Sequence, residues 1–127
     1  MTAVRTGNLV FTSGHGPSGP AGIVTGRVGA DLDVAAGQEA ARLTALNLLA
    51  TLRAELGSLD AVARIVKVLG MVNCPADFAD HPSVINGCSD LLVSVFGDNG
   101  RHARSAVGMG SLPFNMAVEI ELVAEVG

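Results

Sequence analysis

The 127-residue sequence has no tryptophan and no tyrosine, and its four phenylalanines make up the whole 3% aromatic content. Proteins that bind single-stranded nucleic acid usually stack bases on aromatic side chains within a positively charged groove. Here 8 Lys and Arg stand against 12 Asp and Glu, for a net charge of −4, and no basic run occurs. The composition therefore argues against nucleic acid as a partner.

Long hydrophobic runs are also missing. Apolar residues make up 49% of the chain, but none of their runs reaches the roughly 18 residues that a membrane-spanning helix needs. The sequence does not open with the charged-then-apolar pattern of a signal peptide. We therefore expect a folded, soluble, cytoplasmic protein with no membrane partner.

Cysteine is scarce. Cys74 and Cys88 have no CxxC partner and no histidines at ligand spacing, so they predict neither a disulfide framework nor a metal site. We interpret both as reduced cysteines packed as small apolar side chains.

The length corresponds to a single domain over residues 1–127, because no linker, repeat or low-complexity segment divides the chain. A monomer of this size buries only about two-thirds of its unfolded surface. The mean hydropathy of +0.46 indicates apolar surface left for other subunits to cover. We expect an oligomer.

The N-terminal part predicts a hairpin and then irregular structure. The Gly7-Asn8 pair is a turn signal between strands near residues 3–6 and 9–13. Residues 14–22 hold four glycines and two prolines and predict a loop, and residues 23–28 predict a short edge strand interrupted by Gly26.

The loop contains the pattern G-x-G-x-x-G at Gly14 to Gly19. In a dinucleotide-binding fold this pattern opens directly into a helix whose N-terminus binds the pyrophosphate. Here Pro20 and Gly22 follow, so we interpret the pattern as a surface loop.

Helical periodicity follows over residues 33–56, with Asp33 as the N-cap and Gly57 as the end. The apolar run at residues 62–72 predicts a central strand buried on most of both faces.

A second helix is predicted from Pro82 to Gly97. Strands at residues 105–109 and 117–126 complete a β-β-(β)-α-β-α-β-β order, an α+β domain with two helices on one face of a mixed sheet.

The histidines and one arginine are the first candidates for chemistry. His15 and His102 lie on predicted loops beside strands, where binding sites are often built, whereas His81 at the second helix predicts a solvated surface position. Arg104 enters a strand of small apolar residues, and an arginine there needs an anion or solvent. If the last two strands form an antiparallel ribbon, Arg104 lies roughly opposite Glu119–Glu121. A structural cross-strand ion pair and a bidentate arginine for a substrate carboxylate both remain open.

Three segments of the chain, in the same order, resemble the Rid (reactive intermediate deaminase) or YjgF family. They are Gly7-Asn8-Leu9-Val10-Phe11-Thr12-Ser13-Gly14, the alanine-rich first helix, and Ala103-Arg104-Ser105-Ala106-Val107 … Leu112-Pro113 … Val118-Glu119-Ile120-Glu121. The resemblance covers essentially the whole chain and places it in a divergent subgroup. It implies a chorismate-mutase-like fold and a homotrimer with a cleft between each pair of neighbouring subunits. It also implies hydrolysis of 2-imino acids to 2-keto acids and ammonia without a metal or organic cofactor.

The resemblance implies roles for individual residues. Arg104 matches the arginine that holds the substrate carboxylate, and Glu119 matches the acid that positions the attacking water. Ser13 and Gly14 match the loop that closes the pocket, and Asn86 matches a pocket asparagine. We expect His15 and His102 to fill part of the remaining space.

Two departures concern the pocket walls. A cysteine that many members carry two residues after the arginine is Ala106 here, and the family's pocket tyrosine, on a segment that would precede Met1, has no counterpart in a chain without tyrosine. The prediction is an imine deaminase acting on a small carboxylate-bearing imine. The alternative is a non-catalytic trimer that binds a small carboxylate such as a keto acid, and the ribonuclease activity of some family members is disfavoured by the acidic charge balance.

Overall fold

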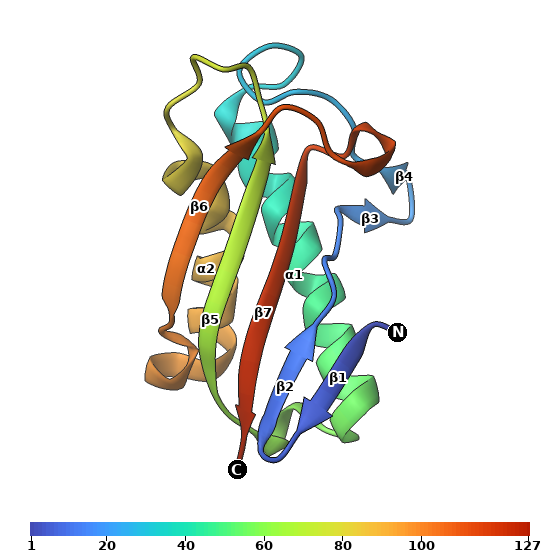
Figure 1. Ribbon diagram of the computed structural model, residues 1–127, viewed down its shortest axis with the longest axis vertical. Coiled ribbons are helices and arrows are strands. Elements are labelled where there is room, and N and C mark those ends of the chain that lie inside the picture. Colours follow the sequence, from blue (N-terminus) through green and yellow to red (C-terminus); the bar gives the residue numbers. More distant parts are fainter.

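The computed structural model describes residues 1–127 as an α+β fold in which two long helices cover one face of a five-stranded mixed sheet (Figure 1). The strand order is β1-β2-β7-β5-β6. The strands of this sheet are β1 (Ala3–Thr6), β2 (Leu9–Thr12), β5 (Val62–Asn73), β6 (Ala103–Met109) and β7 (Val118–Val126), and the helices are α1 (Val34–Leu56) and α2 (His81–Phe96). The predicted fold class is confirmed.

Helix α1 begins and ends where local chemistry predicts. The Asp33 carboxylate accepts a hydrogen bond of 2.8 Å from the Ala36 amide, as an N-cap does. Gly57 ends the helix with a φ of 84°, and its N–H donates to the Arg53 carbonyl at 2.8 Å. A residue with a Cβ rarely adopts this left-handed conformation.

The prediction of a strand over residues 23–28 is wrong. Strand β4 covers only Gly22–Ile23 and pairs with β3 (Ser18–Gly19) in a separate two-stranded sheet. Gly26 has a φ of 125°, which interrupts the extended backbone. Instead, the Val24 and Gly26 amides donate to the carbonyls of Pro17 and Asn115, and the Val28 amide donates to the Asn73 carbonyl at the end of β5.

The predicted ribbon of the last two strands is also wrong. Strand β5 lies between them, parallel to β6 and antiparallel to β7. The apolar β5 takes an interior position in the sheet, with a hydrogen-bonded neighbour on each side. Residues 110–117 therefore carry the chain across the end of β5 (Figure 1). Strand β5 consequently separates Arg104 from β7.

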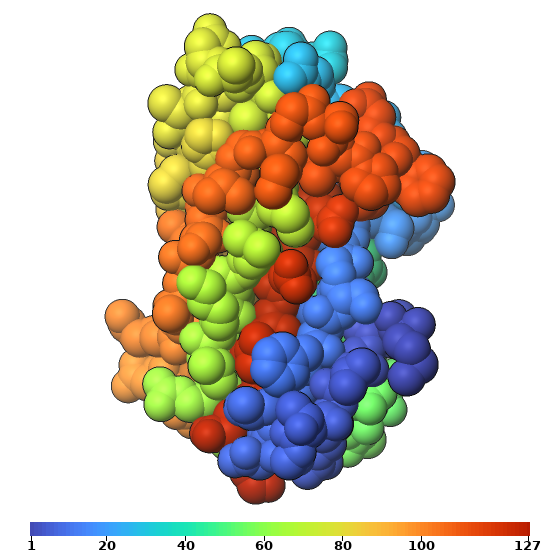
Figure 2. Space-filling model, in the orientation of Figure 1, coloured from blue at the N-terminus to red at the C-terminus, as the bar shows by residue number.

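Only one face of the sheet is covered within the chain. Val68, Val72, Ile120 and Leu122 point towards the helices and are buried, whereas alternate residues face outwards and are partly exposed. Figure 2 shows β2, β7, β5 and β6 side by side on this uncovered face. Within the single chain, β5 is thus buried on one face, whereas the sequence predicts burial on most of both faces. No helix is long and apolar enough to cross a membrane.

Candidate functional site

Arg104 points from the edge strand β6 towards helix α2. It is in register with Val68, whose side chain is buried beneath the helices, and paired residues on neighbouring strands face the same side. The Nη1 of Arg104 donates to Asn86 Oδ1 at 2.8 Å and to Ser89 Oγ at 3.2 Å. Helix α2 therefore fixes the orientation of the guanidinium.

No carboxylate pairs with this guanidinium. The two ion pairs of the chain are Arg42–Glu39 and Arg101–Asp98, so the interpretation of Arg104 as one half of a structural Arg–Glu pair is wrong. Both hydrogen bonds to α2 leave from Nη1. The Nε and Nη2 groups remain available for a planar, two-point contact with a carboxylate.

His102 extends the same network. Its Nδ1 lies 2.6 Å from the Gly100 carbonyl oxygen, and its Nε2 lies 2.9 Å from Ser89 Oγ. Because a carbonyl only accepts, Nδ1 carries the proton and Nε2 of the neutral ring accepts from the serine hydroxyl. Arg104, Ser89 and His102 thus form one chain of donors and acceptors at a cleft of about 250 Å³.

Burial lowers the pKa of His102, and the nearby Arg104 charge lowers it further, while the hydrogen bond to Gly100 raises it. The ring is therefore neutral at physiological pH. The unfolded chain binds this proton at the ordinary pKa of 6.5, above the pKa of the folded state. The contribution of His102 to stability is thus complete above pH 6.5 and is lost as the pH falls through the folded-state pKa.

We expect Arg104→Ala to raise the pKa of His102 part of the way towards 6.5, because the charge disappears and the burial remains. An NMR titration of the His102 ring protons measures this shift. Arg101→Ala is the control, since Arg101 is exposed and already pairs with Asp98. An unchanged His102 pKa in Arg104→Ala would mean that the two groups are not electrostatically coupled.

Glu119 lies on the other face of the sheet. It is in register with Met71 on β5 and points away from the helices. A Cβ on Gly14 would overlap the Glu119 carboxylate, so a larger residue at position 14 would displace the acid from its place against the loop. No hydrogen bond or ion pair within the chain occupies this carboxylate.

Ser13 and His15 flank Gly14, but their side chains are already engaged. The Ser13 hydroxyl donates to the Met1 carbonyl at 2.7 Å. The His15 ring lies 2.7 Å from the Ser13 carbonyl oxygen and 2.7 Å from Thr51 Oγ1 on α1. His15 therefore points towards the helix layer and away from Glu119.

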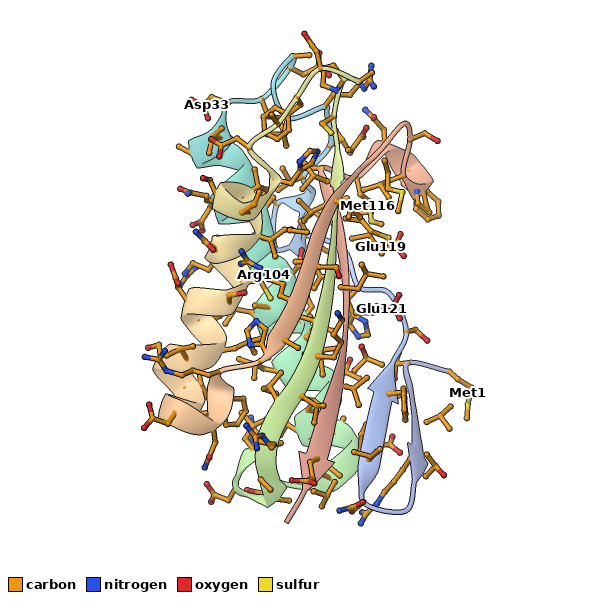
Figure 3. All side chains as sticks on the ribbon, turned by 60° about the vertical axis from the view of Figure 1, so that its left-hand side comes forward. Met1, Asp33, Arg104, Met116, Glu119 and Glu121 are labelled. Carbon is orange, nitrogen blue, oxygen red and sulfur yellow. The ribbon has the colours of Figure 1, made fainter.

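The candidate residues consequently form two separate groups in one chain. Arg104, Asn86, Ser89 and His102 lie between β6 and α2, whereas Glu119, Gly14 and Ser13 lie around β7 and the loop after β2. Figure 3 shows Arg104 on the helix side of the sheet and Glu119 and Glu121 on the opposite side. We call these groups the arginine half-site and the glutamate half-site.

Residues 3–126 match a family model described as "YjgF/chorismate_mutase-like, putative endoribonuclease". The chain belongs to the YjgF family. It is 45% identical to "Protein TCP17" of Trypanosoma cruzi over 98% of this chain and 79% of that protein.

Two solved structures place the YjgF-family chain among its neighbours. The crystal structure of the protein Atu1372 with unknown function from Agrobacterium tumefaciens matches with a TM-score of 0.97 and 46% identity, over 99% of this chain and 82% of that one. E. coli TdcF with bound serine matches with a TM-score of 0.65 and 27% identity, over 98% and 85% of the two chains.

The arginine half-site of this YjgF-family chain includes one residue that sequence analysis missed. Ser89 joins Arg104 to His102, and it lies three residues after Asn86 on α2. A spacing of three puts both side chains on the same helix face. That spacing is the one signal in the sequence that pointed to Ser89.

Proposed function

We propose that this YjgF-family protein hydrolyses small 2-imino acids to 2-keto acids and ammonia, in clefts between the subunits of a homotrimer. The observation that carries the proposal is the Arg104 guanidinium, which helix α2 holds through Nη1 and which no carboxylate of the chain neutralises. Such a group favours a small molecule with a carboxylate. The bound serine of TdcF is a ligand of this kind in a relative.

The separation of the half-sites supports a site shared between subunits. Arg104 and Glu119 face opposite sides of one sheet, so one chain cannot direct both at the same ligand. The uncovered sheet face carries Phe11, Val66 and Val107, which are 44%, 38% and 39% exposed, and supports association of copies through this face. A neighbouring copy would then bring its glutamate half-site to the arginine half-site.

The chemistry that such a cleft must perform is modest. The carbon of a protonated imine is already electrophilic, so the protein needs an anion anchor, a positioned water and a path for protons. Arg104 holds the carboxylate. The Glu119 carboxylate orients the water and accepts its proton as the C–O bond forms. The protonated carboxyl then gives this proton to the amino nitrogen, and the C–N bond breaks as Glu119 takes the hydroxyl proton, which releases ammonia and leaves the 2-keto acid.

The other predicted residues support these two. Asn86 and Ser89 orient the guanidinium, and His102 lines the cleft beside it. Gly14 and Ser13 close the cleft against Glu119, with Gly14 leaving room for the carboxylate. His15 anchors this loop to α1 through Thr51.

The second candidate function is that of a non-catalytic trimer that binds a small carboxylate. Ala106 favours it, because a cysteine that many members of the family carry in the pocket is missing here. The same Arg104 would hold the ligand, and no group would need to activate water.

A coupled assay tests the proposal. An amino-acid oxidase generates 2-iminobutanoate or 2-iminopropanoate, and semicarbazide traps the imine that survives. We expect the wild-type protein to suppress the semicarbazone signal in proportion to its concentration. Carboxylate binding without any suppression would favour the binding protein over the deaminase.

A further inference from the structure

A second cluster of reactive side chains lies at the far end of β6, outside both half-sites. Cys74 follows β5, and His81 is the first residue of α2. The Cys74 Sγ lies 3.6 Å from His81 Nε2, which is hydrogen-bond distance for a thiol and an imidazole. Gly108, beside them, is four residues beyond Arg104 on β6, or about 13 Å at the rise of a strand.

Gly108 permits this approach of thiol and imidazole. A Cβ at Gly108 would lie 2.6 Å from His81 Nε2 and 2.8 Å from Cys74 Sγ. The Phe78 ring packs edge-on against the His81 ring, with 5.3 Å between their centroids and an interplanar angle of 86°. The imidazole, which the sequence predicts to be solvated, is therefore held against the thiol.

Arg27 adds a positive charge to the same place. Its Nη2 donates to the Cys74 carbonyl oxygen at 2.7 Å. Its Nε is buried without a hydrogen-bond partner, and neither ion pair of the chain includes it. An uncompensated guanidinium with a buried free N–H favours an anionic group nearby.

All three side chains line one cavity of about 290 Å³, which is large enough for a small organic acid. Phe78, Pro75 and Met109 supply apolar walls. Both cysteines are buried, with Cys74 4% and Cys88 0% exposed. Only Cys74 lines this cavity, whereas burial raises the pKa of Cys88 to about 12. The two cysteines, which sequence analysis treats alike, thus have different surroundings.

We propose that Cys74, His81 and Arg27 form a reactive-thiol pocket for small carboxylate-bearing electrophiles, which become attached to Cys74. Burial raises the pKa of the Cys74 thiol, and the hydrogen bond with Met109 and the Arg27 charge partly offset this. The thiol therefore needs a base, and His81 Nε2 takes its proton as sulfur attacks. With an α,β-unsaturated acid, sulfur bonds to the β-carbon and the proton returns to the α-carbon, so no further reactant is needed.

Iodoacetate and iodoacetamide test the pocket, because they differ chiefly in charge. Sulfur bonds to carbon, iodide leaves with the C–I electron pair, and His81 accepts the thiol proton. Peptide mass spectrometry follows Cys74 and Cys88 separately in the native protein, and the urea-unfolded chain gives the reference ratio of the two rates. We expect Cys74 to react before Cys88, with an iodoacetate-to-iodoacetamide ratio about tenfold above the reference.

Two variants separate the roles. Arg27→Gln is expected to return the ratio to that of the unfolded chain, whereas the surface control Arg53→Gln leaves it high. His81→Gln is expected to slow both reagents at least about tenfold and to leave their ratio unchanged. Circular dichroism melting confirms that each variant is folded.

The proposal is overturned if Cys74 of the native protein is not alkylated, if its ratio equals the reference, or if folded Arg27→Gln or His81→Gln reacts like the wild type. None of these results depends on imine hydrolysis. Loss of the proposed deaminase activity would therefore leave this inference standing.

Discussion

Arg104→Ala is expected to reduce kcat/KM for 2-imino acid hydrolysis by about a hundredfold or more, because a two-point, charge-assisted contact with the substrate carboxylate disappears. The loss should appear mainly as weaker binding, since the contact exists before water attacks. The semicarbazide competition, run over a range of imine concentrations, measures it. The variant should remain folded, because Arg104 makes no ion pair and is only half-buried.

Two further substitutions control this result. Arg104→Lys keeps the charge but loses the planar pair of donors, so we expect intermediate activity. Arg101→Ala removes an exposed arginine at the rim of the same cleft and should have an effect of less than about threefold. Equal activities of Arg104→Ala and the wild type would show that another group binds the carboxylate.

Local sequence signals predicted the elements of this fold well. Asp33 and Gly57 mark the ends of α1 through contacts within four residues of each end, so the sequence around them is sufficient. The same holds for the Gly7 turn of the first hairpin, where φ is 59°. These features depend on chain geometry near one residue and not on the rest of the molecule.

Strand pairing was not predictable in the same way. A ribbon of β6 and β7 is the simplest pairing for strands that follow each other along the chain. In the structure β5, more than thirty positions earlier in the sequence, separates them. The long apolar run of β5 predicts a central strand, but its pattern does not predict which strands pair with it.

In the site, too, the identity of residues was predictable from the sequence and their arrangement in space was not. The family resemblance pointed to Arg104 and Glu119, but the sequence alone could not show that they face opposite sides of the sheet, because that depends on the register of both strands with β5. The contacts of Ser89 with Arg104 and of His81 with Cys74 join α2 to neighbouring strands. These contacts arise from the packing of the helix against the sheet, which no short sequence pattern predicts.

The glutamate half-site gives the other large expected effect. Glu119→Gln should lower turnover by about a hundredfold or more, the usual contribution of a proton acceptor, because an amide cannot take the proton of the attacking water. Carboxylate binding should persist, since Arg104 is unchanged, and isothermal titration with a 2-keto acid measures it. Glu121→Gln is a matched control on the same face of β7 and should leave turnover near that of the wild type.

Mixing the two inactive variants distinguishes a shared cleft from a site within one chain. If Arg104 of one subunit works with Glu119 of the next, each mixed trimer of Arg104→Ala and Glu119→Gln contains one cleft with both residues intact. An equal mixture, unfolded together and refolded, should then recover about one quarter of the wild-type activity. Each variant refolded alone should remain inactive. A site within one chain would give no recovery, because every chain lacks one of its two residues. That result would contradict the shared cleft inferred from the opposite sheet faces of Arg104 and Glu119.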